Sequence, residues 1–260
     1  MILDEICNYT IRRLEKEKKE NFSKVMEESE KINRKALNFK EIILADNQLG
    51  IIAEIKKASP SMGIIREKFN VEEIVDKYSN SNIQCVSILT EPKFFKGSRE
   101  IFEKARQIID KPLLRKDFII DKYQIDEAYI MGADAILLIA SINDYKRIEE
   151  LNKYAHYKGM QTLVEIHSKE ELEKVSNIEF DMLGINNRNL KTFEIDIKNT
   201  EKLLKYVPEN KVIISESGVE NREDIKYLES LGVDGALIGT SFMESLNIGL
   251  KIRELRGLND

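Results

Sequence analysis

From residue 50 onward, the sequence alternates short apolar runs with amphipathic stretches of about ten residues, and this alternation limits the possible folds more than any other feature. Short apolar runs are typical of strands buried on both faces, and the stretches between them can form helices that cross back over a parallel sheet. The runs predict strands at residues 51–55, 86–89, 113–115, 135–139, 162–166, 182–185, 212–215 and 236–238.

The intervening stretches predict one helix after each strand. These helices have the ranges 71–79, 98–109, 122–131, 144–158, 169–175, 198–206, 222–231 and 242–255. Eight strand–helix units in about 210 residues match the size of a (β/α)₈ barrel. An open doubly wound sheet usually has fewer strands and a Gly-x-Gly-x-x-Gly loop, which this sequence lacks. We therefore predict an α/β protein with the (β/α)₈ (TIM) barrel fold.

The segment before the barrel has a different pattern. Residues 3–45 show helical spacing of apolar positions among dense lysine and glutamate, without a strand pattern. The mixed charges of residues 12–20 predict a solvated helix face rather than a basic binding patch. We expect one domain, with residues 1–49 as an N-terminal helical extension and residues 50–260 as the barrel.

Charge and composition exclude several classes of function. The net charge is −5, which argues against a nucleic-acid-binding protein. No apolar run approaches the roughly 20 residues that span a bilayer, and the first residues lead into a charged segment rather than a signal peptide. Cys7 and Cys85 lack metal-ligand spacing and fit free thiols in a reducing cytosol. We expect a cytoplasmic protein, a monomer or weak homo-oligomer, without membrane or nucleic-acid partners.

Charged and polar residues occur where the predicted strands end. Glu54 and Lys56 share one face of the first strand, because side chains alternate, and that face points into the barrel mouth. Charged groups inside a barrel need partners or a ligand, and active sites of this fold lie at the C-terminal ends of the strands. Further strands end in polar residues, among them Lys116, Glu165, Asn186 and Glu216. Together these residues predict an active site.

The last two loops have the composition of a phosphate site. Ser217-Gly218 follows the seventh strand, and Gly239-Thr240 follows the eighth strand and opens a helix. Glycine lets backbone N–H groups approach an anion, and a helix N-terminus adds a favourable dipole. Barrels commonly bind phosphate at these two loops. The sequence therefore predicts a small phosphorylated substrate.

Several segments, in the same order along the chain, resemble the indole-3-glycerol phosphate synthase family, and so does the N-terminal helical segment. The matching segments are Ile52-Ala53-Glu54-Ile55-Lys56-Lys57-Ala58-Ser59-Pro60-Ser61, Ser87-Ile88-Leu89-Thr90-Glu91, Phe94-Phe95-Lys96-Gly97-Ser98, Leu114-Arg115-Lys116-Asp117-Phe118-Ile119-Ile120-Asp121, Gly184-Ile185-Asn186-Asn187-Arg188-Asn189-Leu190 and Ser215-Glu216-Ser217-Gly218. They cover nearly the whole chain. Met62 departs from the family, which often has a basic residue there.

The resemblance implies a reaction in tryptophan biosynthesis. The family closes the indole ring of 1-(2-carboxyphenylamino)-1-deoxyribulose 5-phosphate, with loss of carbon dioxide and water. No cofactor and no metal is implied, and the two histidines and two cysteines form no ligand pattern. The family resemblance and the amphipathic pattern also lead us to expect that residues before Gly50 partly cover the barrel mouth rather than plug its base.

The resemblance also assigns roles to individual residues. Lys116 is implied to be the acid for ring closure and Glu54 the base, while Lys56 and Glu165 both remain candidates for the dehydration acid. Asn186, Arg188 and Glu216 are implied to line the site and orient the substrate, Asn186 and Glu216 within the catalytic group. The remaining binding residues surround the phosphate or carboxylate or contact the aromatic ring; they are Ser59, Phe95, Leu137, Leu190, Ser217, Gly218, Gly239 and Thr240. His167, two residues after Glu165, is interpreted as a supporting group rather than a catalyst.

Two other functions agree less well with the sequence. Another phosphate-binding barrel, such as phosphoribosylanthranilate isomerase or the tryptophan synthase α subunit, would need different acid–base pairs and lacks the Glu-Ile-Lys-Lys-Ala-Ser-Pro-Ser loop. A catalytically inactive barrel that acts as a sensor or scaffold should have lost ionisable residues, whereas Glu54, Lys56, Lys116, Glu165 and Glu216 are all present.

Overall fold

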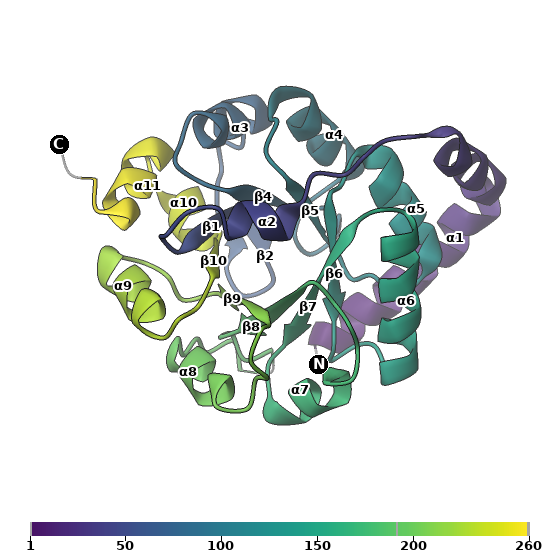
Figure 1. The fold of residues 1–260 in the computed structure, drawn as a ribbon. Helices are drawn as coiled ribbons and strands as arrows, with labels where there is room; N and C mark the ends of the chain where they lie inside the picture. Colours follow the sequence, from purple (N-terminus) through teal and green to yellow (C-terminus); the bar gives the residue numbers. More distant parts are fainter. Residues whose placement is uncertain (1, 191, 259–260) are drawn as a thin grey trace.

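The strands form a closed parallel barrel, as predicted. The computed structural model describes residues 2–190 and 192–258. Going around the barrel, the order is β1, β4, β5, β6, β7, β8, β9 and β10, and β10 pairs with β1 to close it (Figure 1). The strands are β1 (Gly50–Ile55), β4 (Cys85–Leu89), β5 (Leu113–Lys116), β6 (Ala135–Ile139), β7 (Gln161–Ile166), β8 (Met182–Asn186), β9 (Val212–Glu216) and β10 (Gly235–Ile238).

The helices surround the barrel close to their predicted positions, with one error near the end of the chain. They are α3 (Val71–Ser79), α4 (Arg99–Ile108), α5 (Lys122–Met131), α6 (Tyr145–Tyr157), α7 (Lys169–Val175), α8 (Lys198–Leu204), α9 (Arg222–Ser230), α10 (Thr240–Glu244) and α11 (Ile248–Arg256). The single helix predicted at 242–255 is wrong. Ser245 is extended, and the Asn247 side chain caps α11 by accepting from the N–H of Leu250. Asparagine favours such caps over helix interiors.

A small hairpin after β1 was not predicted. It consists of β2 (Ala58–Ser59) and β3 (Gly63–Ile64), which pair antiparallel. Two-residue strands are too short to produce an alternating pattern. The hairpin places the loop after β1 over the mouth of the barrel.

Alternation along β1 sets the orientation of its side chains. Ile51, Ala53 and Ile55 pack outward with the surrounding helices, whereas Ile52 packs inside the barrel with Leu114, Leu137 and Leu163. Glu54 shares the inward face of Ile52. The prediction that Glu54 points inward is therefore confirmed.

The N-terminal extension is not one continuous helix. Helix α1 (Ile2–Lys31) packs beside α5, residues 32–38 are non-helical, and α2 (Phe39–Ile43) follows. Polar groups of the irregular segment bond to the barrel instead of to a helix. Arg34 Nε donates to the carbonyl of Tyr129 at 3.0 Å, and the N–H of Leu37 donates to Asp134 Oδ1 at 2.9 Å. The helix predicted over residues 3–45 is therefore wrong at 32–38.

Helix α2 closes the base of the barrel, which corrects the expectation that the extension leaves the base open. Phe39 and Ile43 are fully buried against inward residues such as Ile52 and Leu237. The N–H of Lys40 donates to Gln161 Oε1 at 2.9 Å, at the start of β7. Figure 1 shows α2 across the end of the barrel that faces the viewer. Only α1 approaches the mouth, where the Tyr9 ring lies edge-on to Phe94 at 6.0 Å.

Across residues 2–190 and 192–258, no helix combines the length and apolarity needed to cross a membrane. In the same residues, no cluster of three or more His, Cys, Asp or Glu side chains is placed to hold a metal ion.

Candidate active site

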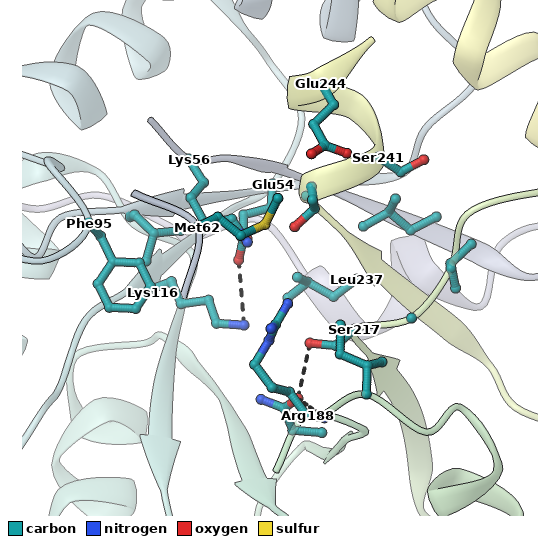
Figure 2. Close-up of a pocket in the computed structure, with 18 of the residues that line it drawn as sticks. Glu54, Lys56, Met62, Phe95, Lys116, Arg188, Ser217, Leu237, Ser241 and Glu244 are labelled. Atoms are coloured by element: carbon teal, nitrogen blue, oxygen red, sulfur yellow. Dashed lines mark hydrogen bonds and ion pairs between the residues drawn. The ribbon is translucent and has the colours of Figure 1, made fainter. Parts of the chain in front are cut away.

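A cavity of about 870 Å³ occupies the C-terminal end of the barrel. Figure 2 shows side chains from several strand ends and loops directed toward it. All of the predicted site residues line it except Glu216 and Ser59: Glu54, Lys56, Phe95, Lys116, Leu137, Glu165, Asn186, Arg188, Leu190, Ser217, Gly218, Gly239 and Thr240. Residues 150 or more positions apart in the sequence therefore meet in one space.

At and directly below the floor of this cavity lies a cluster of two lysines and three glutamates, which we call the mouth cluster: Glu54, Lys56, Lys116, Glu165 and Glu216. Lys56 Nζ lies 2.8 Å from Glu54 Oε1. Lys116 Nζ lies 2.5 Å from Glu216 Oε2, 3.5 Å from Glu54 Oε2 and 3.8 Å from Glu165 Oε2. One ammonium group therefore sits among carboxylates from three different strands.

The surroundings set the protonation of these groups. Burial alone would lower the pKa of Lys116, but the charges of Glu216, Glu54 and Glu165 outweigh it and raise that pKa, so Lys116 carries a proton. Burial opposes ionisation of Glu54, yet Lys56 and Lys116 hold its pKa below the usual value. The site thus combines a protonated amine with an ionised carboxylate, which are the acid and base forms needed for proton transfer.

Glu216 has the most unusual environment of the cluster. It does not line the cavity but lies beneath it, with a side chain that is 1% exposed. Burial, helped by the charge of Glu165 and opposed by Lys116, raises the pKa of Glu216 to about 8. Its Oε1 atom has no hydrogen-bond partner among the described residues. Such an unsatisfied buried atom is costly and is typical of functional sites.

Two glycines leave room for these carboxylates. A Cβ atom on Gly184 would collide with Glu216 Oε1, and one on Gly239 would collide with Glu54 Oε1. Gly239 was predicted only as a phosphate-loop residue, and Gly184 was not singled out at all. No local sequence pattern indicates this packing role, because each glycine and the glutamate it faces lie far apart in the sequence.

The loop after β8 is tied to neighbouring loops by hydrogen bonds. Asn186 Oδ1 accepts from Ser217 Oγ and from the N–H of Arg188, both at 3.0 Å. Arg188 Nη1 lies 3.3 Å from Ser61 Oγ of the first loop. Burial lowers the pKa of Arg188, opposed by Glu54. Arg188 therefore crosses the mouth as a half-buried cation (Figure 2).

Ser59, the last residue of β2, does not line the cavity. It is 8% exposed, and its Oγ lies 3.4 Å from Ser61 Oγ. Met62 lines the cavity and is 42% exposed. An apolar side chain therefore stands at the rim of the cavity.

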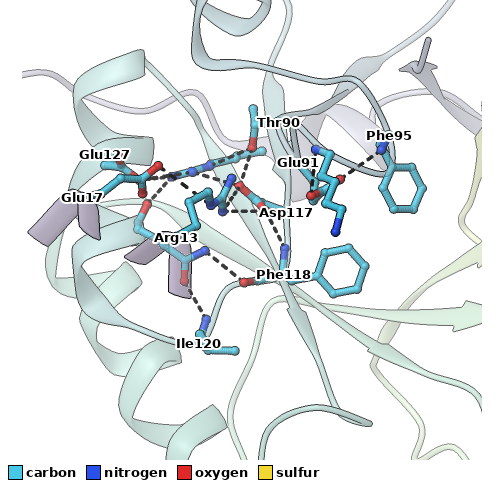
Figure 3. A network of polar contacts seen from close by, with 12 residues as sticks. Arg13, Glu17, Thr90, Glu91, Phe95, Asp117, Phe118, Ile120 and Glu127 are labelled. Carbon is cyan, nitrogen blue, oxygen red and sulfur yellow. Dashed lines mark hydrogen bonds and ion pairs between the residues drawn. The ribbon is translucent and has the colours of Figure 1, made fainter. Parts of the chain in front are cut away.

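Aromatic and aliphatic side chains form one wall. Phe95 and Leu137 were predicted there, and Leu89, Phe118 and Ile139 join them. The rings of Phe95 and Phe118 lie 6.1 Å apart. The Glu91 carboxylate fixes the loop that carries Phe95 by accepting the N–H groups of Lys93, Phe94 and Phe95 at 2.7–3.0 Å (Figure 3).

A second, largely buried polar network lies on the other side of β5. We call it the rear cluster, and it consists of Arg13, Thr90, Arg115, Asp117 and Glu127. Asp117 Oδ2 accepts from Thr90 Oγ1 at 2.9 Å, from Arg115 Nη2 at 3.1 Å and from Arg13 Nη2 at 3.2 Å (Figure 3). Its Oδ1 accepts the N–H of Phe118 at 2.9 Å. Arg13 is thus a buried partner of the barrel, which corrects the prediction of a solvated face at this position; its side chain is 12% exposed.

The two predicted phosphate loops both reach the cavity. Ser217 and Gly218 adopt consecutive left-handed conformations, with φ of 67° and 94°. Gly239 precedes α10 and supplies no capping side chain to its first N–H groups. Backbone turns of this kind expose N–H groups toward an anion.

A (β/α)₈ barrel with acid–base residues and two glycine loops at its C-terminal face defines a class: barrel enzymes that act on small anionic substrates. A sequence profile described as indole-3-glycerol phosphate synthase matches residues 3–255. The chain belongs to the indole-3-glycerol phosphate synthase family.

Relatives of that name align over nearly their full length. The indole-3-glycerol phosphate synthase of Acetivibrio thermocellus is 46% identical over 99% of this chain and 100% of its own. That of Clostridium kluyveri is 45% identical over 95% of this chain and 94% of its own. Among solved structures, 3-hexulose-6-phosphate synthase from Salmonella typhimurium superposes with a TM-score of 0.64 at 14% identity, covering 81% of this chain and 98% of its own. At that identity the likeness shows the fold alone.

Proposed function

We propose that this protein converts 1-(2-carboxyphenylamino)-1-deoxyribulose 5-phosphate into indole-3-glycerol phosphate, carbon dioxide and water. The observation that carries the proposal is the position of Lys116, a protonated amine at the cavity floor among three carboxylates. An acid there can protonate the substrate ketone while the aromatic ring attacks it. The apolar wall of Phe95, Leu137 and Phe118 suits that ring.

Ring closure is the first step of the proposed reaction. The ring carbon that bears the carboxylate attacks the ketone carbon, and Lys116 gives a proton to the ketone oxygen, which becomes a hydroxyl. Loss of carbon dioxide then returns its bonding electrons to the ring and restores aromaticity. An ammonium beside the developing alkoxide stabilises the charge that appears in the transition state.

Dehydration follows, and it needs one acid and one base. Glu54 takes the proton from the carbon next to the ring nitrogen, in line with its lowered pKa. The leaving hydroxyl takes a proton from Glu165 or from Lys56, both of which line the cavity. Lys56 is paired with Glu54 at 2.8 Å, whereas Glu165 lies 3.8 Å from Lys116.

The substrate phosphate is assigned to the loops of Ser217-Gly218 and Gly239-Thr240, opposite the apolar wall. Arg188, Asn186 and Leu190 then bound the substrate on the side of β8. Inorganic phosphate should compete with the substrate, and a structure with phosphate or sulfate should place the anion between these loops. An anion bound elsewhere would refute the assignment. Substitution of Gly239 is a poor test, because a side chain there would also displace Glu54.

The proposal includes the setting of the enzyme. We expect it in the cytoplasm as a monomer or weak homo-oligomer, with a phosphorylated small molecule as its ligand and neither nucleic acid nor membrane as a partner. Sedimentation of the purified protein at several concentrations tests the oligomeric state.

Incubation with the ribulose phosphate substrate tests the function directly. Indole formation is followed by fluorescence, and the chain contains no Trp, so the protein background is low. We expect turnover in the wild type and none in a Lys56→Met, Lys116→Met double variant. Absence of indole product with folded wild type would refute the proposal and favour an inactive ligand-binding barrel.

A further inference from the structure

The proposed reaction takes up one proton from solvent in each turnover. Two protons are given to the substrate, one to the ketone oxygen and one to the leaving hydroxyl, and one is removed from carbon. The net uptake of one proton compensates for the negative charge of the substrate carboxylate, which leaves as neutral carbon dioxide. The active site must therefore be resupplied with a proton.

A second cavity of about 550 Å³ lies beside the first, on the other side of the end of β8. It is lined by the loop after β7 and the loop after β8, and by Leu3 of α1. His167 and Glu171 line this second cavity, whereas Glu165 lines the first. Asn186, Arg188 and Leu190 line both and form the wall between them.

His167 bridges the two cavities. Its Nδ1 lies 3.2 Å from Glu171 Oε2, and its Nε2 lies 3.4 Å from Glu165 Oε1. The Nε2 atom is buried and has no hydrogen-bond partner among the described residues. Glu165 and His167 are two residues apart at the end of β7 and so share one face.

The local chain holds His167 in this orientation. Ser168 caps α7, and Glu171 reaches back to accept the N–H of His167 at 2.7 Å. Asn199 of α8 donates to the His167 carbonyl at 3.3 Å. The ring therefore has a fixed position between two carboxylates, one on each side of the wall.

We propose that His167 is a positioning and relay residue that resupplies Glu165 with a proton from the second cavity, and hence that Glu165 is the dehydration acid. This rests on the function proposed above. After dehydration, the neutral imidazole, protonated at Nε2, gives that proton to the Glu165 carboxylate while its Nδ1 takes a proton from water in the second cavity. Only N–H and O–H bonds form and break, and solvent supplies the net proton.

The charges that face His167 favour this role. They are Glu165 on β7, Glu171 on α7, Glu216 on β9 and, across the second cavity, Arg188 of the loop after β8. Burial lowers the pKa of His167, but the Glu171 hydrogen bond and the nearby carboxylates outweigh it, so the pKa lies above its usual value. The path also avoids the main cavity, which the substrate fills.

The chain offers a matched control, because it has only two histidines. His156 on α6 pairs with Asp181 at 2.7 Å, and its pKa is raised as well, mainly by the hydrogen bond to Asp181. Asp181 precedes β8, at the base of the barrel. His156→Asn therefore removes a similar histidine far from the mouth.

The test measures indole formation at saturating substrate for wild type, His167→Asn, His167→Ala, Glu171→Gln and His156→Asn. Asparagine can keep the contact with Glu171 from the position of Nδ1 but cannot carry the proton. Since direct acid–base catalysis is worth about 10²–10⁴-fold, we expect a smaller loss of about 10-fold in kcat for His167→Asn, with KM within about two-fold. In Glu171→Gln the side chain can still accept the N–H of His167, so the loss of kcat should be smaller. His156→Asn should have the kcat of the wild type.

Chemical rescue separates a proton relay from a structural role. Imidazole buffer should restore kcat of His167→Ala in proportion to its concentration, and it should leave wild type and His156→Asn unchanged. A kcat of His167→Asn within about two-fold of wild type would overturn the relay, as would a loss of kcat with a lowered Tm and no rescue by imidazole. Wild type without turnover would instead overturn the proposed function, and the relay with it.

Discussion

The mouth cluster and the rear cluster lie on opposite faces of one short strand, yet they differ in how well their central carboxylates are satisfied. Lys116 points into the barrel, while Arg115 and Asp117 point outward. Asp117 accepts five hydrogen bonds and leaves neither oxygen unpaired, although Arg13 Nε has no hydrogen-bond partner among the described residues. In the mouth cluster, Glu216 is buried with an unpartnered oxygen and a raised pKa.

The difference separates charged residues that stabilise the fold from charged residues that take part in the reaction. Removing one partner from a satisfied buried network leaves uncompensated charge and costs stability. The mouth cluster holds its charged groups in an energetically costly arrangement, next to a cavity that a substrate can enter. We therefore expect substitutions in the rear cluster to act mainly on folding, and those in the mouth cluster mainly on rate.

The largest expected effect is that of Lys116→Met. Methionine keeps the length of the side chain but cannot donate a proton, so kcat should fall by roughly 10²–10⁴-fold. KM should also rise if Lys116 holds the substrate carboxylate. Steady-state kinetics and the Tm of the same variant test this. Near-normal turnover would remove Lys116 as the ring-closure acid and leave Lys56 as the better candidate.

Asp117→Asn should have the opposite effect, with a large loss of stability and a small loss of kcat. It removes the carboxylate that Arg13 and Arg115 share and leaves them only Glu17 at 3.9 Å and Glu127 at 3.3 Å, which should cost roughly 3–5 kcal/mol of unfolding free energy. For a chain of this size that is a fall in Tm of about 10 °C. Thermal unfolding measures it, and kcat at a temperature where the variant is folded should stay within about ten-fold of wild type. A larger kinetic loss at unchanged Tm would show that both clusters serve catalysis.

Arg13→Met should also lower stability, but by less than Asp117→Asn. Arg13 donates to both Asp117 oxygens, but Arg115, Thr90 and the N–H of Phe118 remain to satisfy them. Charged hydrogen bonds contribute about 1.5–3 kcal/mol, so denaturant unfolding should show a loss of that size. Arg12→Met, at an exposed neighbouring position, is the control and should leave stability unchanged. Equal losses in both variants would contradict burial of Arg13 as the cause.

The smallest effect is a dependence of stability on pH. Glu216 has its pKa raised from 4.5 to about 8 in the folded chain. Its contribution is therefore fully present below the unfolded pKa of 4.5 and is lost as pH rises through 8. Wild-type Tm should decline as pH rises from about 5 to about 8 and level off above pH 8. The decline should be flatter in Glu216→Gln, and a steeper or equal one would be evidence against the raised pKa.

The sequence contains enough information to predict the barrel, because period and run length depend only on nearby residues. Strand alternation also placed Glu54 inward, and strand ends located Lys116, Glu165 and Asn186. What could not be predicted depends on contacts between distant segments. Arg13 lies 104 residues from Asp117, and no local pattern distinguishes it from the solvated charges beside it.

The same limit explains the errors in the extension and at Gly184. Phe39 and Ile43 have ordinary helical spacing, and only the barrel base shows why they are buried. Gly184 resembles any strand glycine until Glu216 is placed beside it. The break at residues 245–247 is different, because Asn247 is a recognisable cap that the apolar periodicity around it obscured.

The closure of the base by α2 has a consequence for synthesis on the ribosome. Ser29, Arg34 and Lys40 bond to Lys158, Asp134 and Gln161, which are 129, 100 and 121 residues later in the chain. At about 5–20 residues per second, these partners emerge roughly 5–25 s after the segment that needs them. Phe39 also packs against Val212 and Leu237, which are made later still. Residues 29–43 are thus translated early and fixed in place late, and a nascent chain halted before β9 should expose the same apolar base as a chain that lacks α2.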